Sequence, residues 1–216
     1  MSKKHVEAVC LPNNEAPQGK QVLLHSCCAP CSSAVLEWMV DHGMRPTVFF
    51  SNSNIYPKEE YLHRRDEIEK HLKALGIAFV EDEYNHSSWR DYVRGLEHEP
   101  ERGRRCEKCF QFRLARAAHY AANHGFHLLT TTLASSRWKD LNQVNEAGTT
   151  ASQQVEGVTF WPQNWRKGGL QERRNTLLHY YNFYNQLYCG CEFSLSARTA
   201  SENAKEQTLV LPKTNS

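Results

Sequence analysis

The sequence predicts an α/β protein built on one parallel sheet of about five strands, with helices on both faces. Two observations lead to this class. Short apolar runs alternate with longer stretches of helical periodicity, and the 216 residues suffice for one domain with a sizeable buried core. Because strands separated by helices pair in parallel, and a parallel sheet needs cover on both sides, the alternation favours a Rossmann-like arrangement.

The individual elements have recognisable starts and ends. Gly43, Gly76 and Gly125 each follow a helical pattern and can end it in a left-handed conformation. The expected strands are 21–26, 46–52, 77–84, 127–133 and 158–161, and the expected helices are 30–43, 58–76, 87–100, 107–125, 140–156 and 168–188. Since the last of these leads directly into Cys189, we expect the C-terminal helix to carry the Cys189–Gly190–Cys191 pair.

We expect a single domain over residues 21–195, flanked by an N-terminal tail over 1–20 and a polar C-terminal tail over 196–216. The first segment is polar and interrupted by Pro12 and Pro17, and the last is rich in Ser, Thr, Asn and charged residues. Internal repeats and low-complexity linkers are not evident in the sequence, which agrees with one domain.

Composition and charge bound the functional class. With 40% hydrophobic and 23% charged residues and a formal net charge of +2, the chain is of ordinary globular type, and its overall charge does not indicate a nucleic-acid binder. Local groups such as Arg102, Arg104 and Arg105 could contact phosphates or form a solvated surface. No run approaches the ~20 apolar residues of a membrane span, and the first residues lack a signal-peptide core, so we expect a cytoplasmic protein that binds no membrane.

Seven of the eight cysteines fall into three tight groups, and only Cys10 stands alone. The groups are Cys27, Cys28 and Cys31; Cys106 and Cys109; and Cys189 and Cys191. Because a reducing compartment disfavours structural disulfides, and burial alone does not explain such short spacings, metal binding or redox chemistry is favoured. The first group follows a predicted strand and opens a predicted helix, where ligands bind in parallel sheets and where backbone amides stabilise thiolates.

Spacing alone leaves the metal open. Two thiolate pairs suit a tetrahedral zinc site and equally an iron–sulfur cluster. The Cys189–Gly190–Cys191 sequence can close only a small, strained disulfide that is easily reduced, or its cysteines can serve as further metal ligands.

Five ordered blocks between residues 21 and 195 resemble the QueH-type epoxyqueuosine reductases. They are LLHSCCAPCS, NIYPKEEYLHRR, RCEKCFQFRLARAA, GFHLLTTTL and YNQLYCGCEFS. This resemblance implies one iron–sulfur reductase domain that reduces epoxyqueuosine to queuosine in the tRNA anticodon loop, the last step of queuosine biosynthesis. The sequence departs from the family pattern over residues 134–140, ASSRWKD, which leaves residue roles there open.

The resemblance also implies the site. A [4Fe-4S] cluster would be held by Cys27, Cys28, Cys106 and Cys109, and Cys189 and Cys191 would form a redox-active pair. Cys31 would lie near an additional iron ion, or it would contact the cluster ligands without binding the cluster itself. The implied partners are tRNA bearing epoxyqueuosine and an electron donor that the sequence does not identify.

Further residues are candidates from their position in the chain. Asn54, Tyr56, Glu60 and Arg64 follow a predicted strand on the same rim as the first cysteines and are candidate substrate-binding residues; alternatively, Glu60 and Arg64 form an ordinary helix pair. His25, Tyr56 and Tyr188 are candidate proton donors, although His25 could equally be a packed structural residue.

Aromatic and basic residues suggest contacts with unpaired bases. Trp138, Trp161 and Trp165, with Arg137, Arg166 and Lys167, could hold an anticodon loop or belong to the core and its solvated rim.

Three other function classes were weighed against the sequence. The fold pattern is similar to that of PP-loop-like ATP-dependent tRNA-modifying enzymes, but CCAPCSS lacks the glycines of their phosphate-binding loop, so we expect no ATP binding. A zinc-stabilised RNA-binding protein without redox activity would use the same cysteine pairs. A thiol–disulfide oxidoreductase would leave four of the cysteines unexplained.

Overall fold

The computed structural model describes residues 21–210, so the expected N-terminal tail and Cys10 lie outside the described residues. Five strands form one sheet in the order β3-β2-β1-β4-β5, and every neighbouring pair is parallel. The strands are β1 (Gln21–His25), β2 (Arg45–Phe50), β3 (Ala78–Glu81), β4 (Leu128–Thr131) and β5 (Thr159–Phe160). The predicted five-stranded parallel sheet of Rossmann-like order is confirmed.

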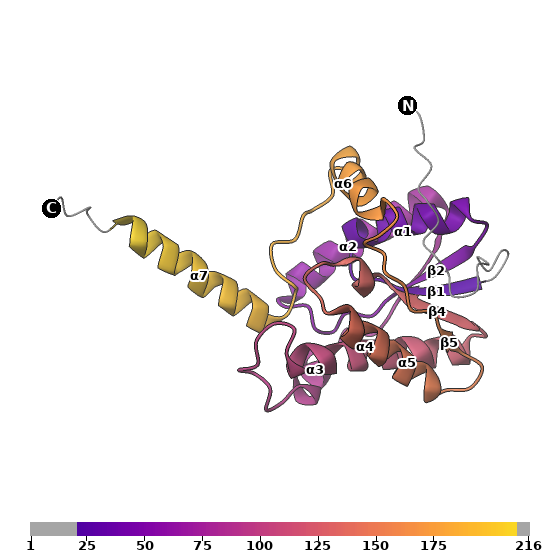
Figure 1. Cartoon of the computed structure of the whole chain (residues 1–216), viewed down its shortest axis with the longest axis horizontal. Coiled ribbons are helices and arrows are strands. Elements are labelled where there is room, and N and C mark those ends of the chain that lie inside the picture. The colour runs from indigo at the N-terminus through magenta and orange to yellow at the C-terminus, as the bar shows by residue number, and fades with distance from the viewer. Residues whose placement is uncertain (1–20, 211–216) are drawn as a thin grey trace.

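Helices cover both faces of the sheet, as predicted (Figure 1). One face carries α1 (Ala29–Asp41), α2 (Lys58–Leu75) and α6 (Leu170–Tyr180), and the other carries α3 (His86–Tyr92), α4 (Arg104–Asn123) and α5 (Leu141–Gln153). A single 3₁₀ turn, η1 (Thr132–Ser135), follows β4.

The core lies between these layers, and the central strand shows why. Val22, Leu23 and Leu24 of β1 are fully buried, since β1 pairs on both edges and is covered on both faces. A consecutive apolar run is the pattern expected of such a strand. The sheet therefore presents a rigid edge from which the loops after β1, β2 and β4 project.

The expected helix over 168–188 is wrong in its second half. Helix α6 ends at Tyr180, because Asn182 adopts a left-handed conformation (φ 51°) and the Phe183 N–H donates to the Leu178 carbonyl oxygen at 3.0 Å. These features end a helix. Residues 181–191, here called the strap, run without helix or strand, and the Cys189–Cys191 pair lies at the end of the strap rather than on a helix.

The residues after the strap also differ from expectation. Helix α7 (Glu192–Val210) occupies much of the segment expected as a polar tail, and it extends away from the α/β body (Figure 1). A polar helix of this kind is helped by i,i+4 ion pairs such as Arg198–Glu202, at 2.8 Å. The division into domains stays a prediction. None of the described helices is long and apolar enough to cross a membrane.

Candidate cysteine-rich active site

The first cysteine group lies where β1 passes into α1. The sulfur atoms of Cys27, Cys28 and Cys31 all lie within 4.8 Å of one another. Cys28 precedes the first turn of α1, and its side chain caps none of the free N–H groups there. A helix start without a capping side chain keeps its positive end available to an anion, which favours thiolates at this point.

This group sits at the switch point of the sheet, between the central strands β1 and β4. The Cys27 N–H donates to Thr132 Oγ1 at 3.4 Å, just beyond the end of β4. Ligands in open α/β sheets bind outside the carboxyl ends of the strands at this position. The first cysteine group therefore lies on the rim of the sheet, as expected.

The second and third cysteine groups approach from α4 and from the strap. Cys106 and Cys109 lie in the first two turns of α4, and the Arg102 N–H donates to Cys106 Sγ at 3.3 Å. Cys109 packs with Cys191, Trp89 and Val93 in a small apolar cluster. A cavity of about 730 Å³ has Cys27, Cys31, Cys106 and Cys189 in its lining, so the three groups meet around one space.

The three thiols of the first group differ in the direction in which their pKa values are shifted. Hydrogen bonding from Cys28, then from Cys31, lowers the pKa of Cys27 well below its ordinary value. Burial raises the pKa of Cys28, and hydrogen bonding with Cys27 raises the pKa of Cys31 to about 11. The group therefore favours one thiolate shared among three sulfurs, which is the ligand form that metals need.

Burial is the main influence on the pKa values of the other cysteines. Burial, followed by the charge of Cys189, raises the pKa of Cys106 to about 11, and burial also raises the pKa of Cys109 and of Cys191. All seven described cysteines are free thiols in this structure.

Two cations face these sulfurs, and neither has a carboxylate partner within salt-bridge distance among residues 21–203. Arg113 is 2% exposed, and its guanidinium donates to Ser51 O at 3.2 Å and to Asn52 Oδ1. Burial acts to lower the pKa of Lys139, but the charges of Cys189, Cys27 and Cys31 outweigh it and raise that pKa. A buried cation needs a compensating anion, and the cysteine sulfurs are the groups placed to provide it.

This arrangement fits a metal group with thiolate ligands. The donor set is rich in sulfur, which suits iron–sulfur clusters and zinc rather than Mg²⁺ or Ca²⁺. The uncompensated Arg113 and Lys139 match a site of net negative charge. The predicted metal site is supported to this extent: a cysteine triad suited to a metal or iron–sulfur group is present.

The four candidate substrate-binding residues lie beyond β2 and at the start of α2. Asn54 is buried, and its Oδ1 has no hydrogen-bond partner among the described atoms, whereas Tyr56 is 43% exposed. Arg64 reaches the lining of the cavity, but its guanidinium binds Glu60 and two carbonyl oxygens of the strap. Their part in substrate binding stays a prediction.

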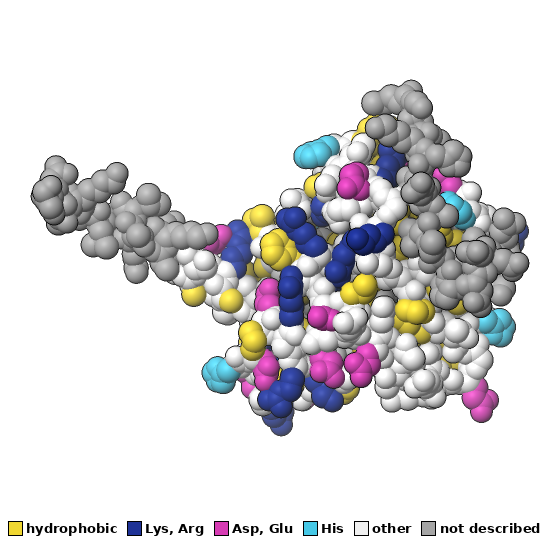
Figure 2. Space-filling view, in the orientation of Figure 1, with side chains coloured by type: hydrophobic (Ala, Val, Ile, Leu, Met, Phe, Trp, Pro, Cys, Tyr) yellow, Lys and Arg dark blue, Asp and Glu magenta, His cyan; other side chains and the backbone are white. Residues whose placement is uncertain are grey.

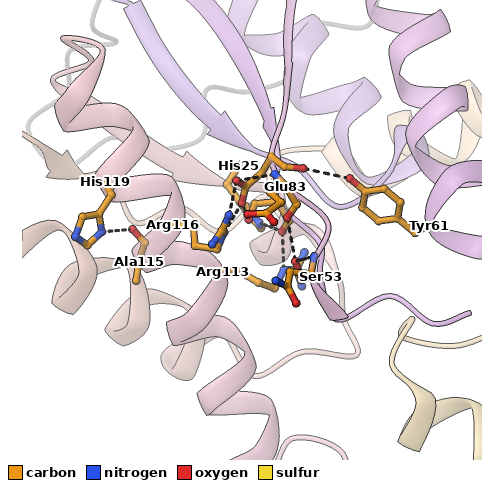
Figure 3. A network of polar contacts seen from close by, with 11 residues as sticks. His25, Ser53, Tyr61, Glu83, Arg113, Ala115, Arg116 and His119 are labelled. Atoms are coloured by element: carbon orange, nitrogen blue, oxygen red, sulfur yellow. Dashed lines mark hydrogen bonds and ion pairs between the residues drawn. The ribbon is translucent and has the colours of Figure 1, made fainter. Parts of the chain in front are cut away.

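His25 is a buried structural residue in this arrangement (Figure 3). Its Nε2 lies 3.1 Å from the Ser51 carbonyl oxygen, which can only accept, so Nε2 carries the proton and Nδ1 accepts from the Thr131 hydroxyl at 2.8 Å. Burial and then the charge of Arg113 lower the pKa of His25 to about 3. The imidazole is therefore neutral, with both nitrogen atoms already engaged.

The other candidate proton donors are tyrosines. The Tyr188 hydroxyl donates to the Tyr56 carbonyl oxygen, and burial followed by the charge of Glu60 raises the pKa of Tyr188 to about 12.

The tryptophans divide into core and surface. Trp161 and Trp165 are buried, and Trp165 Nε1 donates to the Thr131 carbonyl oxygen at 3.1 Å. Trp138 is 64% exposed, with the Arg137 guanidinium 5.0 Å from its ring centroid. Trp138 is thus the one of the three that remains available for stacking.

Basic side chains surround the cavity. Figure 2 shows Lys and Arg side chains gathered near the middle of one face, between α6 and the start of α7. Within the part of the chain that the structure describes, the charged residues that line the cavity are Arg64, Arg102, Arg137, Lys139, Arg174, Arg198 and a single acid, Glu101. This excess of positive charge suits a polyanionic substrate.

Two residues at this site, Arg113 and Lys139, were missed as candidates, and Arg102 was considered only as a phosphate contact or a solvated surface residue. Arg113 is four residues after Cys109 on α4, so helical spacing could have placed it near the sulfurs. Arg102 donates to the carbonyl oxygens of Arg137 and Trp138, and it thereby fixes the loop that carries Lys139. No local pattern in the sequence indicates these loop contacts.

Comparison with known proteins identifies the family of this chain. The family model described as "Epoxyqueuosine reductase QueH" matches residues 22–197. Relatives named "Epoxyqueuosine reductase QueH" include those of Haemophilus influenzae, 45% identical over 84% of this chain and 74% of the relative, and Acinetobacter baylyi, 40% identical over 90% and 87%. The relative of that name from Thermotoga maritima is 34% identical over 82% of this chain and 91% of its own.

Among solved structures, a predicted subunit of tRNA methyltransferase from Methanocaldococcus jannaschii matches with a TM-score of 0.46 and 12% identity, over 74% of this chain and 76% of that chain.

The family match covers all three cysteine groups, and the identities to the curated relatives extend over most of both chains. The family and enzyme class predicted from the sequence are therefore confirmed: this chain belongs to the QueH epoxyqueuosine reductase family.

Proposed function

We propose that this enzyme reduces epoxyqueuosine to queuosine in the anticodon loop of tRNA, with Cys189 and Cys191 as the immediate source of two electrons. The observation that carries the proposal is the single cavity whose lining includes Cys27, Cys31, Cys106 and Cys189. Epoxyqueuosine reductase activity follows from the family; the division of labour among these cysteines is our proposal.

The reaction balances with a dithiol as reductant. An epoxide that takes up two electrons and two protons loses its oxygen as water and leaves an alkene. Two thiols that join in a disulfide release two electrons and two protons. One turnover therefore converts Cys189 and Cys191 to a disulfide, and an external electron donor must reduce it again.

The glycine between the two cysteines allows this chemistry. Gly190 has a φ of 122°, which side-chain-bearing residues rarely adopt, so the backbone can turn sharply between them. A disulfide across one intervening residue is strained and therefore easily reduced.

Cys27, Cys28, Cys106 and Cys109 would hold a [4Fe-4S] cluster, with Cys31 beside an additional iron ion. Such a group supplies one-electron transfer and Lewis acidity when bound. Arg113 and Lys139 would balance its negative charge, because both face cysteine sulfurs and neither has an acidic partner within 4 Å among the described residues.

Lys139 has a second proposed role. It is partly buried in the lining of the cavity, with its charge near Cys27, Cys31 and Cys189. Negative charge develops on the epoxide oxygen as its bond to carbon breaks, and a fixed ammonium group stabilises that charge.

The basic rim would receive the RNA. Arg102, Arg137, Arg174 and Arg198 can contact phosphates, and exposed Trp138 can stack on an unpaired base. Asn54 and Tyr56 are proposed to contact the modified base.

The test separates metal content from electron supply. Anaerobically purified protein should contain about four sulfides and about four to five irons per chain, the fifth being the additional iron ion, and a Cys106→Ser, Cys109→Ser double variant should lose the sulfide and the cluster iron. A Cys189→Ser, Cys191→Ser variant should keep its iron and lose turnover of epoxyqueuosine tRNA. Zinc without sulfide in the wild-type protein, or full turnover without the Cys189–Cys191 pair, would contradict the proposal.

A further inference from the structure

We propose that Arg64 and Glu60 of α2 are positioning residues for the Cys189–Gly190–Cys191 turn: they hold the strap against α2 and so place the two sulfurs. This inference rests on the proposed role of the pair as reductant. It assigns to two candidate substrate-binding residues a different task, which their contacts indicate.

The Arg64 guanidinium is committed to the protein itself. It is 2% exposed, donates to Glu60 Oε1 at 2.6–2.7 Å, and donates to the carbonyl oxygens of Cys189 at 3.3 Å and Tyr188 at 3.4 Å. One side chain thus joins the helix to the backbone on which the first redox cysteine is built. Such charge-assisted bonds are stronger than neutral ones and have defined directions.

The turn is also held at Gly190. The Tyr56 N–H donates to the Gly190 carbonyl oxygen at 2.8 Å, and the Tyr188 hydroxyl donates back to the Tyr56 carbonyl oxygen. An added Cβ at Gly190 would lie 3.0 Å from Arg64 Nη1 and 3.2 Å from Ile55 Cγ1. The glycine therefore allows the close approach on which the Arg64 contacts depend.

Glu60 fixes Arg64 and also binds the strap. Its Oε2 accepts from the Tyr184 hydroxyl at 3.0 Å, while Glu67, two turns along the same face of α2, accepts from the Tyr184 N–H at 2.6 Å. The strap thus has polar contacts with α2 at both of its ends.

The shape of the Arg64 guanidinium explains why it can fix the position of the strap and does more than neutralise the charge of Glu60. The planar guanidinium reaches one carboxylate and two carbonyl oxygens at once, whereas a lysine ammonium is a point charge at the end of a flexible stem. Removing the guanidinium leaves Glu60 and the strap carbonyls without these bonds, and the strap then opens more often.

The experiment measures the accessibility of Cys191, which is 8% exposed, in the reduced holoenzyme. Iodoacetamide labelling followed by peptide mass spectrometry gives a rate for each cysteine. Arg64→Gln should raise the Cys191 rate by about tenfold or more, the size expected from losing a charge-assisted hydrogen bond that keeps the strap closed. Glu60→Gln should have a smaller effect in the same direction, and Arg64→Lys should fall between Arg64→Gln and wild type.

Arg65→Gln is the matched control. Arg65 is the next residue of α2, but it pairs with Asp66 and Glu81 rather than with the strap, so its variant should label like wild type. In turnover assays, Arg64→Gln should lower kcat and leave KM for the tRNA unchanged, because the tRNA contacts stay in place. An increased KM with unchanged kcat and unchanged labelling would instead support substrate binding and overturn the inference.

Two further results would also overturn it: an unchanged Cys191 rate in Arg64→Gln, or equal increases at Cys27 and Cys28, which would mean general loosening. The labelling readout does not require turnover. If the Cys189→Ser, Cys191→Ser variant kept full activity, the proposed function would fail, while the labelling would still report whether Arg64 positions the strap.

Discussion

Replacing Gly190 by alanine should be more costly than replacing another glycine of positive φ, because two separate penalties meet at this position. The backbone φ of 122° lies where side-chain-bearing residues are strained. The added methyl group would also lie 3.0 Å from Arg64 Nη1 and 3.2 Å from Ile55 Cγ1, which is tighter than ordinary contact.

The magnitude follows from these two terms. A strained backbone conformation costs of order 1–3 kcal/mol, and forcing a methyl group into a packed site typically costs about 1–3 kcal/mol. We therefore expect Gly190→Ala to destabilise the attached strap by about 2–6 kcal/mol, the sum of the two terms. Gly76→Ala is the matched control on α2, because Gly76 has a φ of 66° and no atom within 4 Å of an added Cβ.

A double-mutant cycle with Arg64→Ala separates the cost of the backbone strain at position 190 from the cost of the methyl group's contact with Arg64. Urea unfolding of the wild type, both single variants and the double variant gives the four free energies of unfolding. Because Arg64→Ala removes the atom nearest to the new methyl group, the double variant should be less destabilised than the sum of the singles by about 1–2 kcal/mol. Additivity within about 0.5 kcal/mol would refute the reasoning that Arg64 and Gly190 are in direct contact.

Three other predictions concern the core, the substrate surface and the metal. Gly148→Ala should lower the free energy of unfolding by about 1–3 kcal/mol, because its Cβ would lie 2.3 Å from two atoms of the Phe160 ring; thermal unfolding of the full chain measures this, and an unchanged midpoint would contradict it. Trp138→Ala should raise KM for substrate tRNA, because it removes the about 1–3 kcal/mol of binding free energy that stacking on a base contributes. Its thermal stability should be unchanged, since Trp138 is exposed. Arg113→Leu should weaken iron binding by about 10–100-fold, since the guanidinium faces Cys109, and Arg113→Lys should retain more iron; equal iron retention in the wild type and both variants would contradict this.

Most of the fold could be predicted because its signals are local. The buried run Val22–Leu24 and the stop at Gly76 define their elements without reference to the rest of the chain. The failures occurred where a single residue outweighed periodicity. The apolar and aromatic pattern continues beyond Tyr180, but Asn182 turns the chain, and Phe183 packs against His71 of α2 instead of extending α6.

The site was predictable only where its chemistry is carried by residues close together in the chain. Cys27, Cys28 and Cys31 come together as expected, because a strand end and a helix start leave little freedom between them. Lys139 reaches the same cavity from the loop after η1, and Arg102 fixes that loop from the turn before α4. Such contacts depend on tertiary packing, which no spacing in the sequence records.

The position of the cysteines explains how a nucleotide-binding type of fold can serve redox chemistry. In related sheet topologies, the helix after the first strand meets a phosphate with its free N–H groups, and glycines let the phosphate approach. Here, α1 begins beside Cys27, whose pKa is lowered, so the negative charge that this helix end favours belongs to the protein itself. A thiolate at that point would repel a nucleotide phosphate and attract a metal cation, while Arg113 and Lys139 balance the charge that remains. The same sheet edge thus carries sulfur atoms that suit a metal where related sheets bind a phosphate, and we propose that the basic rim beyond it binds the phosphates of RNA.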